Sequence, residues 1–218
     1  MDIATFLPIV FLFGLGLIFK SLLSTGTKRH QIKMEKILEE EMTSNFHRAK
    51  DVPQKAFLKP NMDFLSSINY DKYDDRYRAV ASLKEHLIKK SQLTMVRLSP
   101  PLTNREVKEQ YGIVNLDTVA QGEENYHNYI NSANALASSL IALGDYGAAK
   151  KVLEHTIFEM KSYVLRSYTL SLDIYKKTDI NQIPTFLKAI DSSKILLNYP
   201  DLKEKIQDYS KNIQKEVL

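Results

Sequence analysis

The chain has five histidines, the residues best suited to acid–base or metal chemistry, and they lie far apart in the sequence. No two of them have the His-x-x-x-His spacing that places two metal ligands on one helix face. The absence of cysteine excludes a cysteine nucleophile, an iron–sulfur cluster and thiolate ligation of zinc. The sequence also contains no phosphate loop, dinucleotide loop or hydrolase nucleophile motif. We therefore expect a protein that is not an enzyme, with no cofactor, no metal and no catalytic residues.

Three of the histidines have informative neighbours. His127 lies between Tyr126 and Tyr129 in the most polar surroundings of the five. His86 and His155 each follow a glutamate in a predicted helix, and both are expected on the helix surface.

Charge is distributed unevenly along the chain, although the formal net charge is only +4. Residues 20–60 carry nine bases and five acids, whereas residues 61–218 carry 21 bases and 20 acids. A nucleic-acid-binding domain needs its basic surplus on the folded surface that follows the phosphates. The nearly neutral body therefore argues against nucleic acid as a partner.

An uncharged apolar stretch opens the chain. Residues 3–19 contain no charged side chain, and the apolar character resumes after Lys20 and continues to Leu23. A helix of about 20 apolar residues matches the hydrocarbon thickness of a bilayer. A cleaved signal peptide requires a basic start and a small-residue cleavage site, and this stretch has neither. We therefore expect residues 1–23 to form a single transmembrane anchor.

The flanks of this stretch predict its orientation. Asp2 precedes it, and five bases follow between Lys20 and Lys36. Bases beside a membrane span stay on the cytoplasmic side. We expect a single-pass protein of the cell membrane with its N-terminus outside and its C-terminal body in the cytoplasm. The bases from Lys28 to Lys36 either bind anionic lipid headgroups or serve only to enforce this topology.

A basic juxtamembrane helix and linker are expected over residues 24–60. Met34, Leu38 and Met42 recur every four residues, which indicates an amphipathic helix of about twenty residues that ends by Pro53. Its apolar face can pack on the body, lie on the membrane or pair with a second copy of the chain. The stripe is too short to indicate a coiled coil. The chain after Pro53 is expected to lie extended against the body.

Residues 61–114 are expected to form a helical N-terminal part of the body. Asp71, Asp74 and Asp75 form an acidic cluster, but they lack the alternating spacing and the following glycine of a calcium-binding loop. We therefore expect these acids to cap a helix. Two helices are predicted: one from about Tyr73 to Lys90, capped by Asp71 or Asp74, and a short one, capped by Thr103 or Asn104 and closed by Gly112.

Residues 115–218 show helical periodicity almost without interruption, and no glycine follows Gly147. Long helices with short connections pack as antiparallel neighbours. The predicted fold class is therefore all-α: a transmembrane helix, an amphipathic juxtamembrane helix and an antiparallel helical body. The stripes of this body include Ile130, Ala133, Ala137 and Leu140, then Ala149, Leu153, Ile157 and Met160, then Leu165, Tyr168, Leu172 and Tyr175.

One helical pair in this body resembles a tetratricopeptide repeat, over residues 133–157. Gly144 matches the turn glycine, Asp145 and Tyr146 follow it, and Ala149 matches the small residue that opens the second helix. That family packs 34-residue helix–turn–helix units in arrays. The resemblance implies tetratricopeptide-like repeats over residues 115–218.

The sequence departs from the family pattern at several points. Thr156 replaces the usual second small residue, and Lys161 replaces the closing proline. A second, degenerate unit follows, in which Pro184 begins the second helix, and residues 200–216 would form a capping helix. The whole chain also resembles single-pass bacterial membrane proteins of unknown function.

In tetratricopeptide arrays the first helix of each pair lines the concave face. The resemblance thus implies a partner-binding wall on two helices, with amide groups and bases suited to an extended backbone or a carboxylate. A solvated polar face is the alternative. The residues concerned are Asn131, Asn134, Ser138, Arg166, Thr169, Asp173 and Lys176.

Together these features predict a membrane-anchored cytoplasmic scaffold or adaptor that binds other proteins. The alternative is a self-associating structural subunit of a membrane complex, without catalytic activity of its own. The expected partners are an unidentified cytosolic or membrane protein, and membrane lipid through the anchor and its basic flank. If the chain is a self-associating subunit, a second copy of the chain is also an expected partner.

Overall fold

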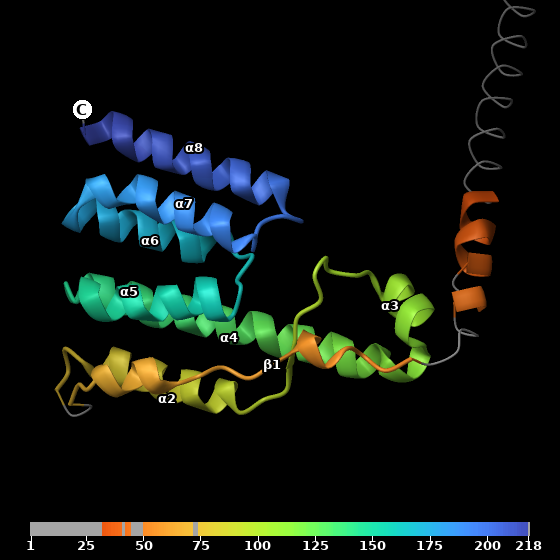
Figure 1. The fold of residues 1–218 in the computed structure, drawn as a ribbon. Helices are drawn as coiled ribbons and strands as arrows, with labels where there is room; N and C mark the ends of the chain where they lie inside the picture. The colour runs from red at the N-terminus through yellow and green to blue at the C-terminus, as the bar shows by residue number, and fades with distance from the viewer. Residues whose placement is uncertain (1–31, 41, 45–49, 72–73, 218) are drawn as a thin grey trace, which may run out of the picture. The chain divides into compact units, whose positions relative to one another are not determined.

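The structure is a computed structural model that describes residues 32–40, 42–44, 50–71 and 74–217 (Figure 1). The chain divides into two compact units. The first unit holds Met1–Lys50 and Asn104–Asn115, and the second holds Asp51–Thr103 and Leu116–Leu218.

The first unit contains a helix at residues 32–40 and 42–44, together with α3 (Asn104–Tyr111) and the short 3-10 helix η3 (Ile113–Asn115). The Arg105 guanidinium donates to the Glu40 carboxylate and thereby joins α3 to the first helix. Gly112 has a φ of 79° and its N–H donates to the Lys108 carbonyl at 2.9 Å. Gly112 therefore closes α3, as its place in the sequence predicts.

The second unit is a stack of helices with one small sheet (Figure 1). Its elements are η1 (Gln54–Ala56), β1 (Phe57–Leu58), η2 (Asp63–Ser67), α2 (Arg78–Ser91), β2 (Met95–Val96), α4 (Leu116–Ala142), α5 (Tyr146–Glu154), η4 (His155–Glu159), α6 (Leu165–Thr178), η5 (Ile180–Gln182), α7 (Ile183–Ser193) and α8 (Pro200–Val217).

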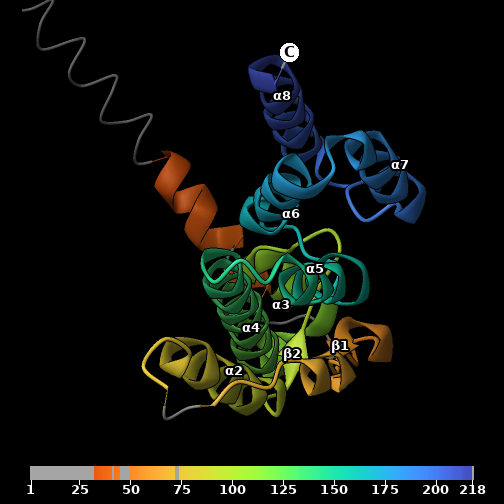
Figure 2. The ribbon, with the colours of Figure 1, turned by 90° about the vertical axis from the view of Figure 1, so that its left-hand side faces the viewer.

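Helix α4 is the centre of this unit. It packs against α2, α5, β2 and α6, and its residues Tyr126, Tyr129, Ile130 and Leu136 are fully buried. Figure 2 shows α4, α6 and α8 following one another on one side of the stack, with α5 and α7 on the other. A second core joins α6, α7 and α8 around Tyr168, whose side chain is also buried.

The turn between α4 and α5 has the geometry that its sequence predicts. Gly144 has a φ of 80°, a conformation that glycine adopts without strain. The Asp145 carboxylate accepts from the Ala148 N–H at 2.9 Å and caps α5. Ala149 is completely buried, so a small side chain allows the close approach of the two helices.

A π-helix, η4, continues α5 and is not foreseen by the sequence pattern. Thr156 within it is buried, and its hydroxyl donates to the Val152 carbonyl at 2.7 Å. Two residues after this π-helix, Lys161 is a non-glycine residue with a φ of 52°. Lys161 stands where the repeat pattern has a proline, and it reverses the chain in the left-handed region instead.

The predicted fold class requires one correction, which concerns the transmembrane helix. Within the described residues, no helix has the length and apolar character needed to cross a bilayer. The span expected at residues 1–23 lies outside the described residues, as does the start of the basic flank.

The predicted helical character of the body is confirmed, but the body also contains one small sheet. Strands β1 and β2 pair antiparallel, with Phe57 opposite Val96 and Leu58 opposite Met95. The chain after Pro53 is therefore a strand between two 3-10 helices rather than a simple extended segment. Two-residue strands are too short to show a period-two pattern, so the sequence offers no signal for them.

Helix α2 begins at Arg78 and not near Tyr73. A turn precedes it, in which the Asp74 carbonyl accepts from the N–H groups of Tyr77 and Arg78. The Asp74 carboxylate binds Arg76 and so stabilises this turn rather than the helix end.

Candidate functional site

Four polar residues of α4 lie on one face of the helix. Glu123, His127, Asn134 and Ser138 are separated by intervals of 4, 7 and 4 residues, which return to the same side of an α-helix. We call these four residues the α4 stripe.

The chain around the start of α6 contacts this stripe at two residues, His127 and Ser138. The Tyr163 hydroxyl forms a 2.8 Å hydrogen bond with His127 Nε2. Two positions into α6, Arg166 Nη2 lies 3.5 Å from Ser138 Oγ. The segment that joins η4 to α6, together with the first turn of α6, therefore lies along the stripe.

Asn134 lies on the stripe between these two contacts. Its side chain is only 4% exposed, and neither Nδ2 nor Oδ1 has a hydrogen-bond partner. A buried amide without partners costs about 1–3 kcal/mol per unsatisfied group. Such a residue is retained at a cost to folding, which makes it a candidate for a role in binding.

A second group of unpaired polar atoms surrounds the Tyr163 ring. Tyr163 stacks on Tyr199 with ring centroids 5.0 Å apart and an 8° angle between the planes. The Arg97 guanidinium carbon lies 5.7 Å from the Tyr163 centroid, a cation–π distance. Arg97 Nε, Glu123 Oε1 and Tyr199 Oη are all buried without a partner.

The unpaired buried side-chain atoms named above thus fall into two groups along α4, one at Asn134 and one around Tyr163. They belong to Asn134 and Glu123 of the stripe, and to Arg97 and Tyr199 beside Tyr163. Native proteins leave few such atoms, and each one calls for an explanation such as a bound group or ordered water.

Burial sets the protonation of this region. It raises the pKa of Glu123, which the Leu98 N–H opposes by donating to the carboxylate. It raises the pKa of Tyr163 and Tyr199, so both phenols stay neutral at physiological pH. It lowers the pKa of His127, which favours the neutral imidazole. The site therefore offers neutral phenols and a neutral imidazole beside the guanidinium group of Arg97.

The structure brings only part of the predicted binding wall together. Asn131 is exposed, one turn from Asn134 on the same helix. Ser138 and Arg166 meet across α4 and α6, and Thr169 donates its hydroxyl to the Arg166 carbonyl at 3.2 Å.

The remaining residues of the wall contact α8. The Asp173 carboxylate accepts from the Tyr209 hydroxyl at 2.8 Å. Lys176 forms an ion pair with Glu216. These two side chains link the C-terminal helix to α6, so their polar groups are already paired within the chain.

Comparison with known proteins supplies no relative for this arrangement. No known protein family, curated protein or solved structure matches the chain. Among the described residues, no group of three or more His, Asp or Glu side chains could hold a metal ion.

Sequence reasoning misses Arg97, Tyr163 and Tyr199. They come from a strand end, an interhelical loop and the start of α8, where no periodic pattern applies. The one sequence signal for these residues is the polar surroundings of His127, because His127 contacts Tyr163 in the structure.

The prediction that His155 lies on a helix surface is wrong. His155 is buried, stacks on Phe64 at 4.4 Å, and contacts Tyr129 Oη through Nε2 at 2.8 Å. Its Nδ1 lies 3.0 Å from the Glu159 carboxylate, which can only accept, so Nδ1 carries the proton and Nε2 accepts from Tyr129.

This Tyr129–His155–Glu159 chain resembles a catalytic relay in connectivity alone. The Tyr129 hydroxyl already contacts His155 Nε2 and Met62 Sδ, so it has no free polar group to offer a ligand. The hydrogen bonds join α4 to η4, and the stacking of Phe64 on His155 adds η2 to this contact, so we assign the chain a structural role.

Proposed function

We propose that the helical body is a tetratricopeptide-like protein-binding module that holds a segment of partner main chain at the surface beside Asn131, Asn134 and Arg166. The observation that carries this proposal is Asn134, whose buried amide has a free donor and a free acceptor. A peptide backbone presents the complementary acceptor and donor in the same unit.

The residues near Asn134 are polar, and one of them can change its contacts. Asn131 is exposed and adds a second amide beside it. At 3.5 Å, the Arg166–Ser138 contact is long for a hydrogen bond, so Arg166 can leave Ser138 at little cost. An arginine released in this way binds a carbonyl or carboxylate of the partner.

The helical pair itself supports the repeat assignment. Gly144 at positive φ, the Asp145 cap and the buried Ala149 occupy the positions that the family uses for its turn and its close helix contact. α6 and α7 follow as a second pair, and Pro184 lies in the first turn of α7.

Site-specific photo-crosslinking tests the proposal. A benzophenone amino acid replaces Asn131 in the full chain, expressed in its native cells, and captured proteins are identified by mass spectrometry. The matched control carries the same group at Lys188, an exposed residue of α7. We expect a specific protein to be captured from position 131 only, and its capture to fall at least tenfold when Arg166→Glu is added.

Two results would count against the proposal. Equal capture from positions 131 and 188 would indicate nonspecific contact. Specific capture that is insensitive to Arg166→Glu, in a variant with unchanged helicity, would place the binding face away from the α4 stripe.

A further inference from the structure

The Tyr129 hydroxyl in the core of the second unit faces two acceptors with one proton. His155 Nε2 lies 2.8 Å from Tyr129 Oη, and Met62 Sδ lies 3.3 Å from the same oxygen. Because a phenol can donate to only one acceptor at a time, its proton has two alternative positions. Burial and the nearby Glu159 carboxylate raise the pKa of Tyr129, so the phenol keeps this proton.

Neutral His155 holds the phenolic proton in the first position. His155 Nδ1 lies 3.0 Å from the Glu159 carboxylate and donates to it, because a carboxylate only accepts. His155 Nε2 therefore carries a lone pair, and Tyr129 donates to it. Met62 Sδ is then an acceptor without a proton, which a weakly accepting thioether tolerates.

Protonated His155 requires the second position. The added proton is bound to Nε2, which changes from an acceptor into a donor toward Tyr129 Oη. The phenolic proton then turns about its C–O bond toward Met62 Sδ, while Nδ1 still donates to Glu159. The only new covalent bond is the Nε2–H bond, and every polar hydrogen of the chain has an acceptor in both states.

We propose that these four side chains form a proton-responsive latch, in which proton uptake by His155 reverses the direction of the hydrogen bonds and creates a Tyr129–Met62 bond. Met62 directly precedes η2, and Tyr129 lies in the middle of α4. The new bond therefore ties the segment before η2 to the central helix in acid. This latch is independent of the proposed partner-binding surface at Asn131, Asn134 and Arg166.

The surroundings of His155 are suited to hold a charge in the core. On η4, the Glu159 carboxylate is paired with Nδ1. On η2, the Phe64 ring stacks on the imidazole with centroids 4.4 Å apart, a distance at which an aromatic face attracts a cation. On α4, the titratable group in contact is the Tyr129 phenol. The other charged side chains closest in sequence to these contacts are exposed; they are Asp63, Lys151 and Glu154.

The latch is expected to change state in mildly acidic solution. Burial lowers the pKa of His155 from its ordinary value, and the Glu159 carboxylate opposes this shift. The folded protein should therefore take up the proton below about pH 6.5, the ordinary pKa of histidine. Above that pH, the neutral state with the Tyr129–His155 bond predominates.

Nitrogen-15 NMR of the imidazole rings reads the state of the latch, because protonated and bare ring nitrogens have well separated chemical shifts. The purified full chain is titrated from about pH 8 to about pH 4.5, a range that covers histidine ionisation. His155 is assigned by the loss of its signals in His155→Gln. We expect a protonated Nδ1 and a bare Nε2 at the high end, and two protonated nitrogens in a folded chain at the low end.

Two results of this titration would overturn the latch. A proton on Nε2 instead of Nδ1 at high pH would mean that the neutral chain has the opposite direction from the start. A His155 that stays neutral until the signals of the folded chain disappear would mean that the core does not accept the charge.

Met62→Leu tests the second acceptor. Leucine has a similar volume but no lone pair, so the phenolic proton would lack a partner in the protonated state. We expect roughly threefold weaker proton binding by His155, seen as a titration midpoint about half a pH unit lower.

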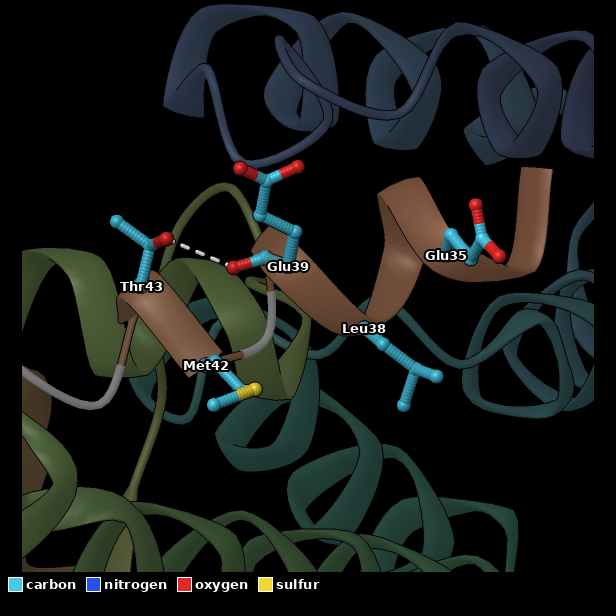
Figure 3. Close-up of a pocket in the computed structure, with 5 residues that line it drawn as sticks. All are labelled: Glu35, Leu38, Glu39, Met42 and Thr43. Atoms are coloured by element: carbon cyan, nitrogen blue, oxygen red, sulfur yellow. Dashed lines mark hydrogen bonds between the residues drawn. The ribbon is translucent and has the colours of Figure 1, made fainter. Parts of the chain in front are cut away.

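Two other methionines provide matched controls for this exchange. Met95 is completely buried in β2. Met42 is 64% exposed and projects beside Leu38 from the helix at residues 32–44 (Figure 3). Met95→Leu and Met42→Leu should both leave the His155 midpoint unchanged.

Tyr129→Phe separates the hydrogen bond from an effect of packing. Without the phenol, Met62 and His155 are no longer connected. Adding Met62→Leu to Tyr129→Phe should therefore leave the midpoint where Tyr129→Phe alone has it. A threefold change that persists without the phenol, or no change in Met62→Leu alone, would overturn the role of Met62 as the second acceptor.

Discussion

Gly122 of α4 lies against Val96 of β2 with no room for a side chain between them. A Cβ atom at position 122 would lie 2.4 Å from Val96 Cγ2 and 3.0 Å from the Val96 backbone nitrogen. The small β1–β2 sheet therefore rests on α4 because this residue has no Cβ.

Gly122→Ala should destabilise the protein by about 1–3 kcal/mol, since the added methyl group must displace strand backbone. Urea unfolding followed by circular dichroism measures the change. Gly147→Ala is the matched control: its Cβ would meet only Asp145 Oδ1, at 3.7 Å. That helical substitution should be neutral or stabilise by about 0.5–1 kcal/mol. Equal effects of the two substitutions would show that Gly122 is not a close-approach position.

Lys161 should be replaceable by glycine with a gain in stability. Its φ of 52° is in the left-handed region, which costs a residue with a Cβ roughly 1 kcal/mol. Lys161→Gly is therefore expected to raise the free energy of unfolding by about 0.5–1 kcal/mol. Lys151→Gly, at an exposed position inside α5, should lower it by about 1 kcal/mol. A destabilised Lys161→Gly variant would contradict the assigned backbone conformation.

The stability of the fold should decrease as the pH falls below about 6.5, the usual pKa of histidine. Burial lowers the pKa of His155, although the nearby Glu159 carboxylate opposes this shift. The unfolded chain then binds a proton more readily than the folded one, so acidification favours unfolding until the pH passes below the lowered folded pKa. Burial also lowers the pKa of His127, so His127 contributes to the acid sensitivity in the same direction.

His155→Gln should be less stable than the wild type at pH 7.5, because the Phe64 stacking and the Tyr129 hydrogen bond are lost. It should also lose part of the pH dependence between pH 7.5 and 5, up to about 1.4 kcal/mol per pH unit for one proton. His86→Gln, on the exposed face of α2, serves as the control and should keep the full dependence. An unchanged slope in His155→Gln would mean that His155 is not a source of the acid sensitivity.

The regular helices of the body could be predicted from the sequence. Periodic apolar positions predict α4, α5, α6 and α8, and Gly144 and Gly112 mark two helix ends because positive φ restricts the residue type. The strands could not be predicted, since two residues carry no period. The π-helix at His155 could not be predicted either, because it depends on the tertiary contacts of its side chains.

The candidate site could be predicted only where it lies on a helix. The repeat pattern placed Asn134, Ser138 and Arg166 on neighbouring faces, and the structure brings Ser138 and Arg166 together. The repeat pattern could not show that Asp173 and Lys176 bind residues of α8, because these contacts join positions far apart in the sequence. It also could not find Tyr199, whose role depends on stacking with Tyr163 across the chain.

Asn134 gives the most direct test of a binding role for the α4 stripe. Leucine has a similar volume but no polar atoms, so Asn134→Leu removes an unpaired buried amide from the free protein. We expect the free energy of unfolding to rise by about 1–3 kcal/mol, because a residue kept for binding is retained at a cost to stability.

The decisive measurement combines this stability change with capture of the partner by the photo-crosslinker at position 131. In the full-length Asn134→Leu variant we predict a higher free energy of unfolding together with at least a tenfold loss of capture. Lower stability together with undiminished capture would contradict the account, because Asn134 would then be a satisfied structural residue with no part in binding.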